Sequence, residues 1–539
     1  MTLATDTKNR VNLPRNTNQA LGIGQFAVDF MKGTLGPGPA RSVLERTELF
    51  HTDAVLCGVS ALALGTNAPT ILRDEAMEYP VGVPDKGACV FGSTARVQPE
   101  KAIVANAAAV REWDSNGTNF GYNPALQHTA GEFGHNDFYA VVVAACQQRG
   151  LDGATALKAM VLLDEIRGRL AEVFSLKTYK IDHVVHGAIG SAATYGALMD
   201  ATPEQIEHAI GMVVAHYIPW RAIRAGKQLS DSKGSSAALS TEVAVMSMKR
   251  AMRGFIGPKD IFRNPESVFR QFVKTSGDSP FDLVLSHSGD DFAIMGMHFK
   301  LGLYEHQSAG ALQGLLNLIS KNPAMLGDGG SSIMSIKIVA YEPAFGIIGD
   351  PAKRDPKTRQ SADHSMVYIV STLLRKAIEQ FARHPERFGA APNAGHSSLL
   401  VPAPSTDTLW KMLMLSPYDY DKAAIFNPVT RGLMEKIAFE HGGPSYDAKY
   451  PDGIPTSLVI TTGDGKAHDS GLVMYPAGHA RNDAADLMGI LDHKFRLLGG
   501  LGLTDPEKSL TRLRSIGKAS AADVASLYDF SIDRKKYEE

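Results

Sequence analysis

A chain of 539 residues is too long for one hydrophobic core, so we expect two or three structural units. With 44% hydrophobic and 21% charged residues, the composition is that of an ordinary globular protein. The 55 basic and 57 acidic residues give a net charge of -2, and no Lys/Arg cluster interleaved with aromatic residues is found. Such a balance does not provide the basic surface that binds nucleic acid or anionic membranes, so we predict neither partner.

Cysteine usage and the N-terminus indicate the compartment. Cys57, Cys89 and Cys146 are far apart and lack the spacing of a zinc site or an iron–sulfur cluster, so we expect reduced structural thiols. No apolar stretch is long enough for a membrane span, and residues 1–18 lack the apolar core of a secretory signal. We predict a disordered tail over residues 1–18, with a short processed leader as the alternative. The expected location is the cytoplasm, or the mitochondrial matrix in a eukaryote.

Residues 19–281 are expected to be helical throughout, because apolar residues recur at helical spacing between short Gly, Pro and Asn segments. One helix start is marked clearly. Thr202 is a predicted N-cap, Pro203 takes the first helical position, and Gln205 is placed to complete a capping box. We therefore predict a large all-helical domain.

Residues 282–481 change character, because segments with a period of two appear between helical ones. Helices are predicted at Gln307–Ile319 and Ala362–Phe381. Strands are predicted at Phe292–Phe299, Ser332–Tyr341, Ser457–Thr462 and Gly471–Tyr475, the last two flanking a turn at Gly463–Gly465. The helical pattern returns over residues 482–539. The predicted fold is mainly α: a large all-helical domain with an inserted smaller α+β lid domain, and C-terminal helices that return to the helical domain.

A first polar cluster follows the predicted helix Lys101–Trp113. It contains Asp114, Asn116 and Thr118 and continues into a Gly/Asn/His-rich stretch that includes His128 and ends near His135. A carboxylate, an amide, a hydroxyl and imidazoles on loops between apolar helices could bind and deprotonate a small polar substrate. Turn and cap chemistry uses the same residue types, and the residues alone favour neither interpretation.

Two histidines, His183 and His186, lie just before the small-residue segment Ala188–Leu198. Histidines three apart could bind a metal, but no carboxylate stands at ligand spacing on the same helix. One acid–base histidine with one structural neighbour fits better. A position near a helix N-terminus lowers the basicity of an imidazole, which leaves it neutral and able to accept a proton.

Cationic residues form a third group. Arg221, Arg224, Lys227 and Lys233 lie close together in the chain, and Lys300 precedes His306 by six residues. Arginine and lysine bind carboxylates through charge-assisted hydrogen bonds, and a lysine also stabilises the enolate-like charge of proton abstraction. The alternative for most such residues is a solvated surface. Tyr368, in the helix that follows Asp363, could be a core residue or a general acid.

Together these segments resemble the MmgE/PrpD family, and within it the branch that dehydrates 2-methylcitrate. The segments that carry the resemblance are WDSNGT at Trp113–Thr118 with Gly134-His135, IDHVV at Ile181–Val185, FKLGLYEHQSA at Phe299–Ala309, RQSADHSMVY at Arg359–Tyr368, and YPAGHARND at Tyr475–Asp483 with Lys494-Phe495. They occur in family order across most of the chain.

The resemblance implies a helical domain with a smaller lid, a homodimer, an active site between the domains, and no metal or organic cofactor. Its implied catalytic residues are Asp114, His135, His183, Lys300 and Tyr368, and its substrate-binding residues are Asn116, Thr118, Lys233 and His306. The chain has more residues between Thr118 and His135 than the family pattern, so His128 and His135 both remain candidates for one role. Lys233 and His306 also depart from the family spacing.

The expected activity is hydro-lyase chemistry in propionate catabolism, converting a small tricarboxylate, 2-methylcitrate, to 2-methyl-cis-aconitate. Either Asp114 or His183 would remove the proton, Lys300 would hold the developing negative charge, and a histidine or Tyr368 would assist departure of the hydroxyl group. The alternatives are a cis-aconitate decarboxylase or an epimerase of the same family. A non-catalytic helical binding protein is the third interpretation, which we favour least.

Overall fold

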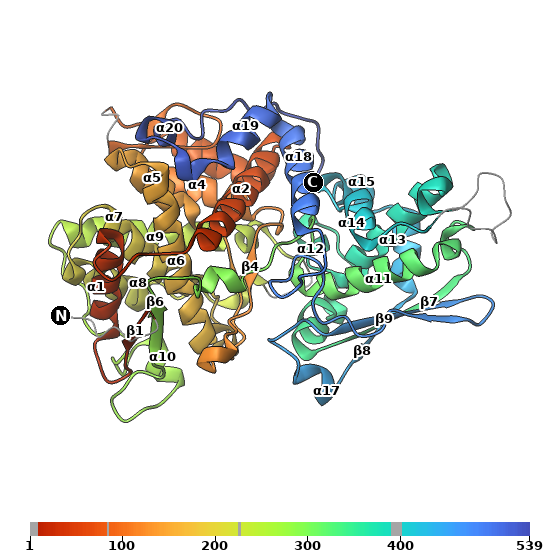
Figure 1. Ribbon diagram of the computed structural model, residues 1–539, viewed down its shortest axis with the longest axis horizontal. Helices are drawn as coiled ribbons and strands as arrows, with labels where there is room; N and C mark the ends of the chain where they lie inside the picture. Colours follow the sequence, from red (N-terminus) through yellow and green to blue (C-terminus); the bar gives the residue numbers. More distant parts are fainter. Residues whose placement is uncertain (1–8, 83–85, 225–227, 390–401) are drawn as a thin grey trace.

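The computed structural model describes residues 9–82, 86–224, 228–389 and 402–539 of the chain. Helices dominate, as predicted, and strands are few and short. Figure 1 shows two parts side by side. We call them the helical part, which comprises α1–α9 with α18–α20, and the sheet part, which runs from α11 to β10.

The helical part is a compact bundle of long helices. Helix α9 packs against α4, α7 and α8, α6 packs against α7, and α1 packs against α8. The predicted capping box of α8 is present, with Thr202 and Gln205 each accepting from the other's backbone N–H. The helices are α1 (Gln19–Lys32), α2 (Arg41–Ala63), α3 (Asn67–Met77), α4 (Pro99–Arg111), α5 (Tyr139–Arg149), α6 (Gly153–Val173), α7 (Val184–Leu198), α8 (Pro203–His216) and α9 (Asp231–Met252).

The predicted N-terminal tail is wrong for part of its length. Strand β1 (Arg10–Leu13) pairs antiparallel with β6 (Leu283–Ser286). Val11 and Leu13 are buried, and their alternation with polar residues is the pattern of a half-buried strand. Residues 1–8 lie outside the described residues. This short pairing ties the start of the chain to the end of the helical part.

The sheet part is built on four strands in the order β10-β9-β7-β8. Strands β7 (Ile333–Ala340) and β9 (Thr456–Thr462) confirm two predictions, and their pairing is antiparallel. Strand β8 (Ile437–His441) runs parallel to β7, and β10 (Ala467–Asp469) pairs with β9. Helix α11 (Ala309–Lys321) packs against β9 and against α13 (Met366–Arg383) and α14 (Thr406–Leu413), while α16 (Pro428–Glu435) packs on α13.

Two predicted strands are wrong. Segment 292–299 contains a short 3-10 turn at Ala293–Gly296, and its apolar side chains are buried against α2 and α6 rather than paired in a sheet. Segment 471–475 contributes only a single bridge between Val473 and Thr456, because the turn at Gly463–Gly465 leads into β10 instead. In both cases tertiary packing decided the backbone pairing.

The C-terminal helices pack mainly on the helical part. Helix α18 (Leu487–Gly502) packs against α2, α14 and α19 (Pro506–Leu513), and α20 (Ala521–Ala525) packs against α5. A buried ion pair between Lys494 and Asp53, 2.6 Å, joins α18 to α2. The predicted domain boundaries at residues 281 and 481 stay predictions.

In the part of the chain that the structure describes, no single helix has the length and apolar composition needed to cross a membrane. Only α2 and α3 taken together meet these criteria, and they are bent by 91° relative to each other.

Candidate active site

Asp114 lies at the centre of a buried polar network. Helix α4 ends at Arg111, and the chain turns so sharply that Asp114 adopts a left-handed backbone conformation with φ 50°. Trp113 Nε1 donates to Ser60 Oγ at 3.0 Å and anchors this turn to α2. A residue with a side chain in this conformation is strained, and such strain persists where the surrounding structure requires that position. The carboxylate of Asp114 is fully buried.

Three cations surround the Asp114 carboxylate. Arg111 and Lys300 both make ion pairs with Oδ1, and Lys233 Nζ lies 3.6 Å from Oδ2. Although burial alone would raise it, these positive charges hold the pKa of Asp114 well below its usual range. Asp114 is therefore ionised and weakly basic, which suits an anchor for cations better than a proton acceptor.

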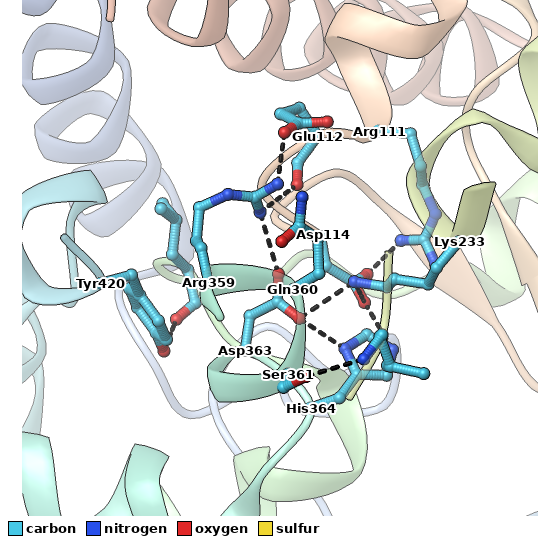
Figure 2. A network of polar contacts seen from close by, with 12 residues as sticks. Arg111, Glu112, Asp114, Lys233, Arg359, Gln360, Ser361, Asp363, His364 and Tyr420 are labelled. Carbon is cyan, nitrogen blue, oxygen red and sulfur yellow. Dashed lines mark hydrogen bonds and ion pairs between the residues drawn. The ribbon is translucent and has the colours of Figure 1, made fainter. Parts of the chain in front are cut away.

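A second group of buried charges lies beside Asp114 and its three cations (Figure 2). Lys233 Nζ donates to Asp363 Oδ1 at 2.9 Å, and Arg359 lies between Glu112 and Asp363. A lysine in the first turn of a helix opposes the helix dipole, so the burial of Lys233 at the start of α9 requires these carboxylates. The network joins α4 and α9 of the helical part to α12 (Arg359–Ala362) of the sheet part.

His364 lies between these two groups of charged side chains and contacts one carboxylate in each. Its Nδ1 lies 2.6 Å from Asp363 Oδ1, and its Nε2 lies 3.1 Å from Asp114 Oδ2. Burial, followed by the charge of Lys233, lowers the pKa of His364 to about 3. The ring is thus a neutral spacer between two carboxylates.

His183 has the arrangement of a general base. It stands at the N-cap of α7, and its Nδ1 lies 3.0 Å from Asp182 Oδ1, while Arg224 binds the same carboxylate. Its Nε2 is buried and has no hydrogen-bond partner among the described residues. Burial lowers the pKa of His183, so the imidazole is neutral near pH 7. Asp182 thus stands beside one nitrogen while the other has no partner among the described residues, which is the arrangement of a general base. The neighbouring His186 donates its Nε2–H to the Phe174 carbonyl oxygen at 2.9 Å and is structural, as one of the two histidines was expected to be.

The structure places His135, not His128, in the site. Strands β4 (Thr118–Asn119) and β5 (Gly134–His135) pair so that Thr118 lies opposite His135. The intervening residues form a separate loop, closed by a bridge between Asn123 and His128. His135 Nδ1 lies 3.9 Å from Asp114 Oδ1, and its ring lies 5.2 Å from that of His183, whereas His128 pairs with Glu172. The longer spacing in this chain is therefore accommodated by a loop.

A cavity of about 40 Å³ lies between the two parts of the molecule. From the helical part it is lined by Arg111, Phe133, His135, His183, Arg221 and Arg224, from the sheet part by Ile347, Ile348, Lys353 and His364, and from the segment just before α11 by Glu305 and Gln307. Asp114, Lys300 and Lys233 do not line it, but Asp114 contacts three lining residues, Arg111, His135 and His364. The cavity wall thus combines neutral imidazoles with cations.

Four predicted site residues neither line this cavity nor belong to the charged network around Asp114. Tyr368, in the first turn of α13, donates its hydroxyl to the Asp419 carbonyl at 2.6 Å, and burial raises its pKa, so it is a core residue here. His306 stacks on His298 with ring centroids 5.2 Å apart. Asn116 donates its side-chain amide to the Asn136 carbonyl oxygen and to the Asp137 carboxylate, and Thr118 is buried in β4. Of the predicted residues, Asp114, His135, His183, Lys233 and Lys300 are brought together.

Two larger cavities are less suited to acid–base chemistry on an anion. One, of about 250 Å³, is lined by His298, His479, Arg169 and Arg481, but its arginines already pair with Glu172, Asp291 and Asp452. The other, of about 400 Å³, is lined mainly by apolar residues such as Ile218, Trp220 and Phe272. We therefore assign the site by its charges rather than by volume.

Three residues of the network could offer donor atoms to a metal ion. Single donor atoms of Asp114, Asp363 and His364 lie within 4.8 Å of one another. However, Lys233 contacts both carboxylates, and Arg111, Lys300 and Arg359 pair with one or the other. Because these cations already neutralise the donors, a metal ion would be repelled, and the residues fit a metal poorly.

Sequence reasoning missed Arg111, Asp363, His364 and Lys353 as parts of the site. Asp363 and His364 stand in the segment RQSADHSMVY, in which only Tyr368 was predicted to be a site residue. Helix α13 begins only at Met366, so Asp363 and His364 precede it on a turn that faces Asp114. Lys227, one of the four clustered cations, lies outside the described residues.

Comparisons with known proteins concern the family that the chain resembles. Residues 33–280 match the MmgE/PrpD N-terminal domain, and the resemblance to the MmgE/PrpD family is thereby confirmed. The chain is similar to 2-methylcitrate dehydratase of Escherichia coli (strain K12), with 23% identity over 443 residues, which cover 78% of this chain and 82% of that protein. Identity to the 2-methylcitrate dehydratase of Cupriavidus necator is 22% over 469 residues, which cover 82% and 83%. The enzyme of Salmonella typhi is 21% identical over 442 residues, which cover 78% and 82%.

Proposed function

We propose that the protein is a hydro-lyase that dehydrates 2-methylcitrate to 2-methyl-cis-aconitate by side-chain acid–base catalysis, without a metal or organic cofactor. The observation that carries the proposal is His183, a neutral imidazole beside Asp182 that lines a cavity together with cations and whose Nε2 has no hydrogen-bond partner among the described residues. The relatives that share about four fifths of the chain's length carry this activity in their names.

In the proposed reaction His183 Nε2 removes the proton on the carbon next to a carboxylate. The electron pair of the broken C–H bond forms the double bond, and the hydroxyl group leaves from the adjacent carbon. Such carbon acids are weak, so the negative charge that develops must be stabilised by fixed cations. Arg111 supplies one such cation at the cavity wall. Asp114 holds Arg111 in place and also binds Lys300 and Lys233.

The departing hydroxyl needs a proton, which we assign to His135. In the described state burial, Arg111 and Lys300 hold the pKa of His135 well below its ordinary value. A substrate with three carboxylates opposes those charges and raises the proton affinity of the ring. His135 would then donate its proton to the hydroxyl group, which leaves as water, while His183 keeps the abstracted proton.

The described cavity of about 40 Å³ is smaller than a tricarboxylate, since ligand pockets commonly measure about 300 Å³ or more. Residues of both parts line it, so substrate entry requires the parts to separate. We propose that the sheet part acts as a lid that excludes water on closing. From the resemblance to the family, we also propose that the protein is a homodimer and is located in the cytoplasm.

The proposal is tested by offering 2-methylcitrate, citrate and cis-aconitate separately to the purified full-length protein in the presence of a chelator. Ultraviolet absorbance detects the conjugated double bond of the product. We expect absorbance to rise with 2-methylcitrate. No rise with 2-methylcitrate, accompanied by release of carbon dioxide from cis-aconitate, would replace dehydration by decarboxylation.

A further inference from the structure

Two cations that line the cavity form no ion pair with any residue that the structure describes. Arg221 begins the short turn η4 (Arg221–Arg224) of the helical part, and Lys353 ends η9 (Pro351–Lys353) of the sheet part. Within the described residues, neither side chain makes an ion pair or a hydrogen bond. Their neighbours Arg111 and Arg224, by contrast, pair with Asp114 and Asp182.

The lack of a partner is costly because Lys353 is buried and Arg221 is half-buried. Lys353 is 8% exposed, and burial lowers its pKa to about 8, although Glu305 and Asp350 attract the ammonium and Arg221 and Lys233 repel it. Burial also lowers the pKa of Arg221. A buried unpaired charge destabilises a fold, so it is retained where a ligand supplies the missing charge.

The backbone fixes Arg221 in place. Its N–H donates to the Lys180 carbonyl at 2.8 Å, and the N–H of Asp182 donates to the Pro219 carbonyl at 2.8 Å. These bonds tie η4 to the segment that carries Asp182 and His183. Arg221 is therefore held at a defined distance from the proposed base, and neither Arg221 nor Lys353 contacts Asp114 among the described residues.

We propose that Arg221 and Lys353 form a clamp that binds one carboxylate group of the substrate from opposite parts of the molecule. The inference rests on the proposed function, since it assigns the residues that recognise a polycarboxylate in that same cavity. The planar guanidinium offers two parallel hydrogen bonds to a carboxylate, and the ammonium adds a third. Without an anion the two cations repel each other across the interface, and a bound carboxylate draws the two parts together.

The test measures binding of tricarballylate, a tricarboxylate that has no hydroxyl group and cannot be dehydrated, by calorimetry. Arg221→Gln and Lys353→Met should each weaken binding by about 10- to 100-fold, the range for a charged hydrogen bond. Lys357→Met is the matched control, because it removes the same charge four residues away at a position where the side chain is 61% exposed. It should leave the affinity unchanged.

Ligands that lack one carboxylate show whether the clamp holds a single group. Glutarate lacks the central carboxylate of tricarballylate, and methylsuccinate lacks a terminal one. For whichever ligand has lost the clamped group, wild type and both variants should bind equally well, which closes a thermodynamic cycle. Wild-type affinity should fall above about pH 8, where Lys353 loses its proton, and should not fall there in Lys353→Arg.

Folding provides the second readout. Removing an unpaired buried cation should leave the melting temperature unchanged or raise it, whereas removing a structural ion-pair partner lowers it. Equal tricarballylate binding by wild type and both variants would overturn the clamp even if the protein dehydrates 2-methylcitrate. Failure of the wild type to bind any of the three ligands would also overturn it. Weakened binding in the two variants alone would support the clamp even if no dehydration were found.

Discussion

Lys300 binds Asp114 at two points. Its ammonium donates to the main-chain carbonyl of Asp114 at 2.7 Å and also pairs with the Asp114 carboxylate. One lysine thus fixes both the strained backbone and the charge of the residue at the centre of the network. Because both groups are fully buried, each requires the other.

This relationship predicts strong coupling between the two residues. Asp114→Asn leaves Arg111, Lys300 and Lys233 facing a neutral group, and should lower the free energy of unfolding by about 3 to 5 kcal/mol. Lys300→Met should have a similar effect. Because each single change strands a charge, the double variant should lose less stability than the sum of the two. Additive losses, measured by denaturant unfolding, would show that the pair is not coupled.

The two histidines of α7 and its N-cap should respond in opposite ways. His183→Asn removes the proposed base and should lower kcat by about 100- to 10,000-fold with little change in melting temperature. His186→Asn removes the contact to the Phe174 carbonyl and should lower stability while kcat is largely kept. Steady-state kinetics and thermal unfolding of both variants check this. Full activity in His183→Asn would remove His183 from the mechanism.

The pH dependence of kcat/KM should report the low pKa of His183. Burial lowers that pKa, and Asp182 opposes the effect. The base must be unprotonated to act, so activity should persist to lower pH than an imidazole with an ordinary pKa near 6.5 would allow. Asp182→Asn removes the opposing charge and should move the acidic limb to still lower pH. A limb that does not move in this variant would contradict the assignment.

The substitution Tyr368→Phe tests whether Tyr368 is a core residue, as its contacts in the structure indicate, or a catalytic residue, as the family resemblance implies. The hydroxyl donates to the Asp419 carbonyl inside the sheet part, so its loss should cost about 1 kcal/mol of stability. Because Tyr368 does not line the cavity, kcat should change little. A large fall in kcat with unchanged stability would mean that Tyr368 reaches the substrate.

Glu305 should make stability depend on pH. Burial raises its pKa to about 7 from an ordinary value of 4.5, so the folded protein binds this proton more tightly than the unfolded chain. The resulting stabilisation is fully present below the unfolded-state pKa and is lost as pH rises through about 7. Glu305→Gln has no such proton to lose. Its stability relative to wild type should rise between pH 5 and 8, by at most about 1.4 kcal/mol per pH unit. A pH-independent difference would argue against the raised pKa.

Sequence patterns correctly predicted those structural features that depend only on residues close together in the chain. The capping box at Thr202 and the alternating strand β9 follow from neighbouring residues alone, and the motifs around Asp114 and His183 indicated the right segments. The choice between His128 and His135 required the pairing of β4 with β5. The partners of Asp114 come from positions as distant as Lys300 and His364, and no spacing rule in the sequence specifies such contacts.

The central claim is that the base at the cavity wall removes a proton from 2-methylcitrate. Proton NMR of 2-methylcitrate incubated with the wild type, His183→Asn and His186→Asn tests it most directly. With the wild type and with His186→Asn, we expect the methyl doublet of 2-methylcitrate to be replaced by the methyl singlet of 2-methyl-cis-aconitate, and we expect no such change with His183→Asn. Appearance of this singlet at the same rate with all three proteins, or no singlet with the wild type, would contradict the account.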